Sequence, residues 1–442
     1  MTTAPREHWG SRTGFMLAAI GSAVGLGNMW RFSYLAAENG GAAFVLLYLA
    51  MTAGVALPVL LAELMLGRGA QQGPLRALVH FGGARWRPLG WLFVGAGFLI
   101  LSYYGVIAGW TLRYTAEAIW HGFPADAAAH FAQISAGPVA VAWHLGFLAL
   151  TAGIVAGGIQ RGIERASVVL MPLLFAILAG LAVYAATVPG AGTGYAYYLQ
   201  TDFGELLSLT VLRDAAGQAF FSLSLGMGAM MTYASYLRRD ADLPDEAVVI
   251  ALSDFAVAFV AGLVVFPLLF ALGLQQDVGA STIGALFITL PHAFAEMGAA
   301  GRAVGLLFFA ALLVGALTSA ISLLEVVVSS AIDRGWSRPV ATLGLGGAVG
   351  ITGIAAALDT AVLGVMDQIA GNVLLILGGL AIALFVGWSM RDPEAELAAG
   401  AGRVHWFFLW RGLLRFVVPA VLAVVLASAI PAALQSLRAL FD

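Results

Sequence analysis

The sequence contains no cysteine and no lysine, so all 21 of its basic residues are arginine. Without cysteine the chain can have no disulfide, no thiol catalysis and no thiolate metal site. Its seven histidines are scattered, and none belongs to a His-Glu-x-x-His cluster. A P-loop is also missing, so we do not expect an enzyme. The net charge of -3 gives no indication of a nucleic-acid partner.

Apolar residues are abundant. Hydrophobic residues make up 61% of the chain, charged residues only 10%, and the mean hydropathy is +0.93. This composition predicts an all-α polytopic membrane protein, embedded in the lipid bilayer and without a separate soluble domain. The first apolar run is too long for a signal peptide and lacks a small-residue cleavage site, so we expect it to remain as a helix.

Eleven apolar segments are long enough to cross a membrane, and we treat residues 1–442 as one transmembrane domain. The segments cover roughly residues 12–36, 41–68, 89–120, 139–158, 165–188, 213–237, 247–273, 302–332, 338–356, 361–390 and 405–435. An odd number of spans places the two termini on opposite sides of the membrane.

Arginine is concentrated on one side of this predicted topology. The N-terminal tail and the even-numbered connections carry Arg6, Arg12, Arg76, Arg85, Arg87, Arg161, Arg165, Arg238, Arg239, Arg334, Arg338, Arg391 and Arg403. The opposite side carries mainly Arg213, Arg302 and Arg438. The positive-inside rule therefore predicts a cytoplasmic N-terminus and an external C-terminus, and we expect the protein to lie in the inner (plasma) membrane.

The first predicted span is interrupted at residues 21–31. Three glycines fall within seven residues there, and each costs a helix roughly 1 kcal/mol relative to alanine. Asn28 and Arg31 add polar groups that hydrocarbon cannot satisfy. Non-helical backbone in a membrane survives only inside protein or beside a cavity, where its free carbonyls and amides can bind ions and polar substrates. The alternative is that Gly21 and Gly25 form a small face for close helix packing.

A second interruption follows five helices later. Residues 218–232 include Ser222, Ser224, Gly226 and Gly228 in the middle of the sixth span. Interrupted helices at corresponding places indicate an inverted five-helix repeat, with helices 1 and 6 unwound mid-membrane. The first repeat would cover residues 12–188 and the second residues 213–390, followed by an eleventh helix.

Several motifs resemble the neurotransmitter:sodium symporter family, over nearly the whole chain. They are Gly21-Ser-Ala-Val-Gly-Leu-Gly-Asn-Met-Trp-Arg-Phe32, Glu38-Asn-Gly-Gly-Ala-Ala-Phe44, Pro58 with Glu63 and Gly67, Gly162-Ile-Glu-Arg165, and Thr232-Tyr-Ala-Ser-Tyr236. Three features depart from the family pattern: Ser33 stands where proline is common, a twelfth helix is missing, and Asp254 stands where many members have asparagine.

The resemblance implies two sodium sites. The first would use the carbonyl of Ala23, the side chains of Asn28 and Asp254, the hydroxyl and carbonyl of Ser222, and the substrate carboxylate. The second would use the carbonyls of Gly21, Val24 and Gly315 and the hydroxyls of Thr318 and Ser319. Hard cations prefer such oxygen ligands. The alternative for Thr318 and Ser319 is that each hydroxyl bonds its own backbone or a neighbouring helix.

The resemblance also implies an amino-acid site between the two interruptions. The substrate carboxylate would meet the amides near Leu26 and Gly27 and the hydroxyl of Tyr104. Its side chain would lie among Ile100, Phe221, Ser224, Met227, Ser319 and Leu323, although ordinary core packing is the alternative for the apolar members. Monoamine-transporting members have an aspartate at the position of Gly25, so a substrate here should bring its own carboxylate.

Gates are implied on both sides of that site. The outer gate would pair Arg31 with Asp367, above a lid of Tyr104 and Phe221. The inner gate would combine Arg6, Trp9, Ser235, Tyr236 and Asp333. In helix 5, nine residues separate Gly162 from Pro172, which resembles a bacterial variant in which this helix unwinds; a proline kink is the alternative.

These residues together predict a sodium-coupled symporter for a neutral, hydrophobic L-amino acid. Independence from chloride is expected because chloride-dependent relatives place serine where this chain has Ala258, while Tyr48, Gln218 and Ser222 match them. Asp254 could itself provide the missing negative charge and, as a hypothesis, carry a proton outward once sodium leaves. Two alternatives stay open: a proton-coupled carrier of the same architecture, and a sensor that binds without transporting.

Overall fold

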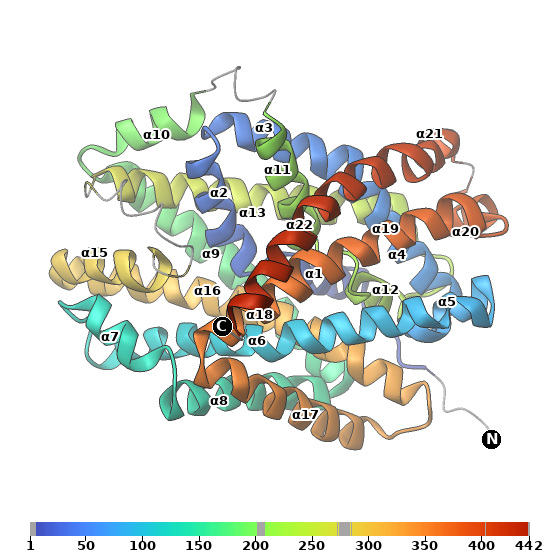
Figure 1. Ribbon diagram of the computed structural model, residues 1–442, viewed down its shortest axis with the longest axis horizontal. Helices are drawn as coiled ribbons and strands as arrows, with labels where there is room; N and C mark the ends of the chain where they lie inside the picture. The colour runs from blue at the N-terminus through green and yellow to red at the C-terminus, as the bar shows by residue number, and fades with distance from the viewer. Residues whose placement is uncertain are drawn as a thin grey trace.

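A computed structural model describes residues 6–200, 208–271, 273, 283, 285–402 and 404–440 of the chain. Every regular element within these residues is a helix (Figure 1), which confirms the predicted all-α membrane class. Arg403, which the topology prediction used, lies outside the described residues.

Nine helical stretches of the described chain are long and apolar enough to cross a membrane. They are Ala42–Ala70, Ala84–Trp120, Pro138–Ala156, Ile159–Thr187, Leu243–Ala271, Gly298–Ile332, Arg338–Leu358, Thr360–Ser389 and Phe407–Ala439. The two interrupted spans are built from shorter pieces: α1 (Arg12–Ala23), a π-helical segment (Gly27–Arg31) and α2 (Phe32–Glu38), and later α11 (Leu209–Ser222) and α12 (Ala229–Ala234). The nine stretches and these two interrupted segments thus lie at the positions of the eleven predicted spans, except that residue 272 of the predicted span 247–273 lies outside the described residues.

Most long helices run along the longest axis of the molecule (Figure 1). Their labels are α3 (Ala42–Met51) continuing into α4 (Leu57–Ala70), α6 (Arg87–Trp120), α8 (Pro138–Ala156), α9 (Arg165–Thr187), α13 (Leu243–Ala271), α16 (Gly298–Ile332), α17 (Arg338–Leu358), α18 (Thr360–Asp367) continuing into α19 (Leu375–Leu384), and α21 (Phe407–Gly412) continuing into α22 (Val418–Ala439). The central helix α16 packs against α6, α9 and α1, so it is buried among its neighbours.

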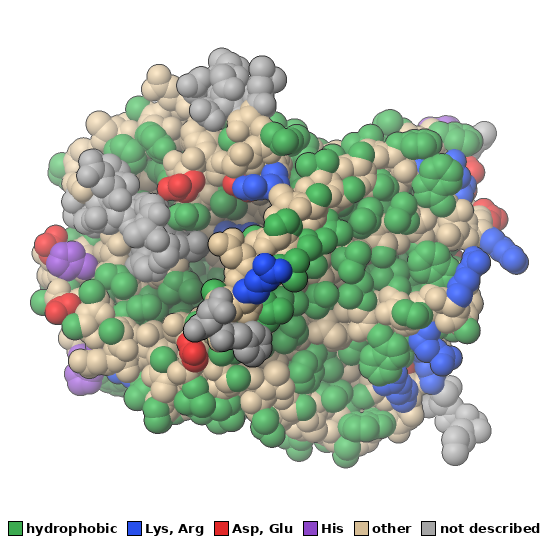
Figure 2. Space-filling view, viewed as in Figure 1, with side chains coloured by type: hydrophobic (Ala, Val, Ile, Leu, Met, Phe, Trp, Pro, Cys, Tyr) green, Lys and Arg blue, Asp and Glu red, His purple; other side chains and the backbone are tan. Residues whose placement is uncertain are grey.

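Short helices cover both ends of this bundle. They are α5 (Pro74–Gly82), α7 (Ala127–Ile134), α10 (Ala191–Leu199), α15 (Leu290–Glu296) and α20 (Pro393–Ala401). None was predicted, because each is shorter than a membrane span. Helices α5 and α20 lie at the end that carries the N-terminus (Figure 1), where Figure 2 shows many of the basic side chains.

Several predicted helix boundaries were wrong. The third, seventh and eighth spans begin at Ala84, Leu243 and Gly298 rather than at residues 89, 247 and 302. Helix 5 begins at Ile159 rather than at residue 165, because residues 159–164 form a π-helical segment that continues into α9 despite Gly162. This helix is therefore not unwound here. Helix 11 extends to Ala439 rather than 435, since Pro431 is accommodated inside it.

Candidate functional site

The first helix break is centred on Val24. Helix α1 ends at Ala23, and Val24 has an extended backbone with φ -75° and ψ 108°. The chain resumes as the widened turn Gly27–Arg31 before α2. The break therefore frees backbone groups between Ala23 and Gly27, inside the interval predicted from the glycine pattern.

The second break separates α11 from α12. Ser224, Gly226 and Gly228 all have positive φ there, of 54°, 78° and 76°. At Gly226 a side chain would overlap the carbonyl oxygen of Leu375, so only glycine fits. The Gly226 amide donates to the buried carboxylate of Glu63 at 2.7 Å, which stabilises an amide that the helix no longer uses.

Direct hydrogen bonds join the two breaks. The hydroxyl of Ser224 donates to the carbonyl of Ser22 at 2.7 Å, and the side-chain amide of Gln218 donates to the carbonyl of Gly27 at 2.9 Å. The side-chain oxygen of Gln218 is buried without a partner. Backbone and side-chain oxygens of both breaks thus share one polar region.

A buried carboxylate lies at the centre of this region. Asp254, on α13, is fully buried. It accepts hydrogen bonds from Asn28 at 2.6 Å, from Ser222 at 2.8 and 2.9 Å, and from Tyr48 at 2.9 Å. Asn28 also accepts the amide of Gly25 at 3.0 Å. The structure therefore brings together the three side chains predicted for the first sodium site, and it adds Tyr48, which had been considered only for chloride.

The residues predicted for the second sodium site lie where α1 meets α16. A Cβ on Gly21 would be 3.0 Å from Cβ of Thr318, and one on Gly315 would be 3.4 Å from Cα of Gly25. The hydroxyl of Ser319 lies 3.5 Å from the carbonyl of Val24. All five predicted residues are thus gathered at one helix contact.

The hydroxyl of Thr318 donates within its own helix, to the carbonyls of Val314 at 3.0 Å and Gly315 at 3.1 Å. This is the bond expected for an ordinary membrane threonine. This bond uses the hydroxyl proton of Thr318 and leaves lone pairs of its oxygen free to bind a cation. Ser322, one turn further along α16, donates to the carbonyl of Ser319 and accepts from the hydroxyl of Ser22, both at 2.8 Å. Neither Ser22 nor Ser322 was predicted as part of the site, because serine is common in packed membrane helices.

A cavity of about 330 Å³ lies beside the first helix break. It is lined by Leu26, Gly27, Arg31, Tyr103, Tyr104, Ile107, Phe221, Ile283, Leu286, Phe287, Leu363, Gly364 and Asp367. Six of the predicted substrate-site and outer-gate residues therefore share one cavity. Ile100, Met227 and Leu323 are buried but do not line it.

The hydroxyl of Tyr104 is buried without a hydrogen-bond partner. A Cβ on Gly25 would lie 3.3 Å from this oxygen and 2.7 Å from the hydroxyl oxygen of Ser319. Gly25 therefore leaves space between two hydroxyls. A carboxylate placed here would give Tyr104 the acceptor it lacks.

Arg31 and Asp367 do not form an ion pair in the described structure. The guanidinium of Arg31 instead lies 4.6 Å from the ring centroid of Phe221 and donates to Asn372 at 3.2 Å. Both charged residues line the same cavity, so space separates them. The predicted outer pair is open in this conformation.

The opposite side is closed. Arg6 forms an ion pair with Asp333 at 2.6 Å, donates to the hydroxyl of Ser235, and lies 4.5 Å from the ring centroid of Tyr236. The indole of Trp9 donates to the carbonyl of Tyr233 at 2.9 Å. The five residues predicted for the inner gate are thus assembled around the N-terminal segment.

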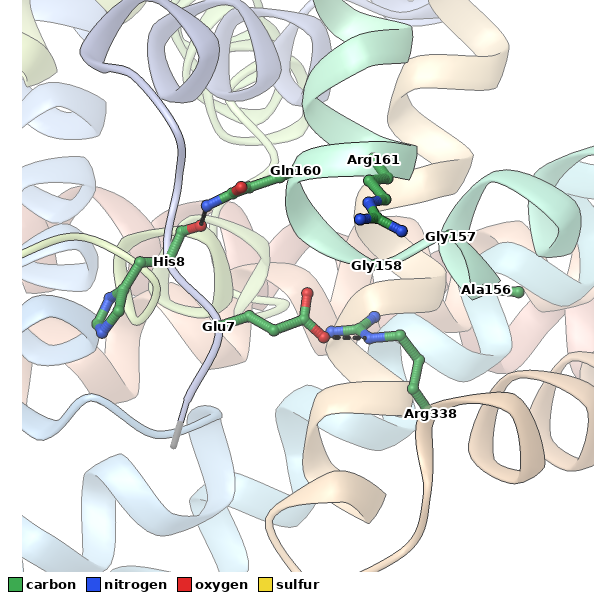
Figure 3. Close-up of a pocket in the computed structure, with 8 residues that line it drawn as sticks. All are labelled: Glu7, His8, Ala156, Gly157, Gly158, Gln160, Arg161 and Arg338. Atoms are coloured by element: carbon green, nitrogen blue, oxygen red, sulfur yellow. Dashed lines mark hydrogen bonds and ion pairs between the residues drawn. The ribbon is translucent and has the colours of Figure 1, made fainter. Parts of the chain in front are cut away.

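The same N-terminal segment is attached to the start of helix 5. Glu7 accepts the amide of Ile159 at 2.7 Å and the guanidinium of Arg338 at 2.8 Å, and Gln160 donates to the carbonyl of His8 at 2.9 Å. Figure 3 shows Glu7 facing Arg338 and Gln160 reaching His8. These bonds keep helix 5 against the inner gate.

Comparisons with known proteins agree with this architecture. The model of the "Sodium:neurotransmitter symporter family" matches residues 6–137 and 135–438. An uncharacterized sodium-dependent transporter of Bacillus subtilis, YhdH, is 38% identical over 94% of this chain and 96% of its own length. One from Methanocaldococcus jannaschii is 35% identical over 92% of this chain and 88% of its own. The crystal structure of MhsT in complex with L-phenylalanine is similar with a TM-score of 0.86 and 42% identity, over 96% of this chain and all of MhsT.

Proposed function

The chain belongs to the sodium:neurotransmitter symporter family, and we propose that it imports a neutral, hydrophobic L-amino acid with two sodium ions, by alternating access and without chloride. The observation that carries this proposal is the convergence of Asn28, Ser222 and Asp254 at the two helix breaks. The N-terminus would face the cytoplasm and the C-terminus the outside, as the arginine distribution indicates.

Two sodium ions would suffice for concentrative uptake. Each ion entering at 100 mV releases about 2.3 kcal/mol, and a tenfold concentration gradient adds about 1.4 kcal/mol. Coupling to both ions could therefore raise the internal concentration of a neutral solute above its external concentration by several powers of ten. The oxygen-only donors around Asn28 and Thr318 suit a hard cation.

The substrate's carboxylate would lie near the free hydroxyl of Tyr104 and the amides of Leu26 and Gly27. Its side chain would face an apolar environment, because Ile107, Leu286 and Phe287 line the neighbouring cavity. Arg31 and Asp367 are the cavity's charged residues, and we assign both to the outer gate. A charged substrate side chain would therefore be buried without a dedicated partner, at a cost of several kcal/mol. The phenylalanine bound by MhsT supports this specificity.

Competition for uptake tests the substrate class. Proteoliposomes with a sodium gradient should accumulate labelled leucine, and excess unlabelled Ile, Val, Phe or Trp should inhibit strongly. Glutamate and lysine should not inhibit, because the cavity's two charged residues, Arg31 and Asp367, are assigned to the outer gate rather than to the substrate side chain. Preference for glycine, a charged amino acid or a monoamine would contradict the assignment, and binding without any uptake would favour the sensor alternative.

Chloride independence follows from the surroundings of Asp254. The hydroxyls of Tyr48 and Ser222, which chloride-dependent relatives also have, donate to this carboxylate. Ala258, one turn further along α13, is buried and offers no donor. The negative charge that chloride would bring is therefore provided by the protein itself.

Anion replacement tests this point. Exchanging chloride for gluconate should leave the initial rate of sodium-driven uptake unchanged within about twofold. Replacing sodium by choline should abolish uptake, and a proton gradient should not restore it. A collapse of uptake in gluconate would contradict chloride independence, and rescue by protons alone would favour the proton-coupled alternative.

A further inference from the structure

A basic pocket of about 590 Å³ opens at the end of the molecule that carries the N-terminus. It lies between α5, the start of α6 and the turn after α16. Its lining consists of Gln72, Leu75, Arg76, Val79, His80, Arg87, Trp91 and Arg334. Four of these eight residues are basic and none is acidic, which distinguishes it from the sodium and substrate regions.

The positive charges in this pocket are not compensated by the described part of the protein. Arg76, His80, Arg87 and Arg334 are exposed, and none of them takes part in an ion pair among the described residues. The acidic neighbour of Arg334 in sequence, Asp333, is already bound to Arg6 and to the amide of Gly73. Cations held this close favour an external anion.

The pocket also has an apolar side. Leu75 and Val79 are four residues apart on α5, as are Arg76 and His80, so the helix presents an apolar row beside a basic row. Trp91 is 47% exposed, and the guanidinium of Arg334 lies 4.4 Å from its ring centroid. An exposed tryptophan beside arginines at the end of a membrane helix is typical of the membrane–water interface.

We propose that this pocket binds the headgroup of an anionic phospholipid. Arg76 and Arg87 would bind the phosphate oxygens, and Trp91 with the apolar row would contact the glycerol and the first acyl carbons. The volume of about 590 Å³ lies within the range of roughly 300–1,000 Å³ that is typical of pockets for drug-sized ligands, which is more than a free phosphate needs. Basic pockets between membrane helices are known to hold such headgroups.

Lipid titration of the full-length protein in neutral detergent tests this proposal. Phosphatidylglycerol, phosphatidylcholine and inorganic phosphate are added separately, and bound lipid is counted by native mass spectrometry. The pocket variant combines Arg76→Gln with Arg87→Gln. Its matched control combines Arg85→Gln with Arg165→Gln, which removes the same charge from exposed positions outside the pocket.

The native protein and the control should bind one phosphatidylglycerol more tightly than phosphatidylcholine. The pocket variant should bind it about 25-fold more weakly, since each arginine near an anionic surface contributes roughly fivefold. The single charge reversal Arg87→Glu should also weaken phosphatidylglycerol binding. Sodium-dependent amino-acid binding, measured on each variant, serves as the control for correct folding. The proposal would be overturned if the pocket variant bound phosphatidylglycerol as tightly as the native protein does, or if the native protein bound phosphatidylcholine as tightly as phosphatidylglycerol. Displacement of the lipid by equimolar phosphate would also overturn it.

Discussion

Replacing Thr318 by valine is expected to weaken sodium-dependent substrate binding by roughly 10- to 150-fold. The substitution keeps the shape of the side chain and removes its oxygen. A lost bond to a charged partner costs about 1.5–3 kcal/mol, and Thr318 lies against Gly21 at the end of α1. The measurement is sodium titration of labelled amino-acid binding to the purified protein.

Thr151→Val is the matched control. Thr151 is also fully buried in a membrane helix, and its hydroxyl bonds the carbonyl four residues earlier at 3.0 Å, as that of Thr318 does. Thr151 is outside the candidate site, so its replacement should leave sodium affinity unchanged. Equal losses in both variants would indicate general destabilisation, and unchanged sodium dependence in Thr318→Val would refute the second sodium site.

Asn28→Ala extends the test to the other ion. Asn28 joins the break in helix 1 to Ser222 and Asp254, so its loss should also leave the Asp254 carboxylate with one donor fewer. A similar or larger fall in sodium affinity is expected. If two ions bind, the steepness of the sodium titration should decrease in each single variant.

The positions of both helix breaks could be predicted from glycine and polar residues alone. Glycines next to Asn28 and Arg31 in the first span, and next to Ser222 and Ser224 in the sixth, indicate a break because polar groups in a membrane need the partners that freed backbone provides, although glycines alone would also suit close helix packing. The detailed geometry could not be predicted, because Ser224 adopts a left-handed conformation that few non-glycine residues take. Its bond to Ser22 joins segments about 200 residues apart, and such pairings leave no local pattern.

Long-range pairing also explains why the hydrogen-bond partners of other polar residues could not be predicted. Glu63 was recognised only as part of a motif, whereas the structure places it against the amide of Gly226. Tyr48 was associated with chloride, yet it donates to Asp254. In each case the partner lies on another helix, so the sequence shows that a polar group is present without showing what satisfies it.

Arg6→Ala should shift the protein toward a conformation open at the N-terminal end. The pair with Asp333 is mostly buried, with side-chain exposures of 16% and 7%. Its loss is worth on the order of 1–3 kcal/mol, between the values for exposed and buried pairs. The equilibrium would then move by roughly 5- to 150-fold.

The absence of cysteine provides a clean reporter for this shift. Ser322→Cys introduces one thiol at a position that is 1% exposed and packed against Ser22 of α1, so reaction with a membrane-impermeant methanethiosulfonate should be slow. Adding Arg6→Ala should accelerate labelling of this thiol at least about fivefold. If the N-terminus is cytoplasmic, this acceleration should occur in inside-out vesicles and not in right-side-out vesicles. Arg238→Ala is the control, because the ion pair of Arg238 with Asp240 is exposed on both sides, at 82% and 73%, and its loss should change little. Equal labelling rates in the two arginine variants would show that Arg6 does not hold the gate closed.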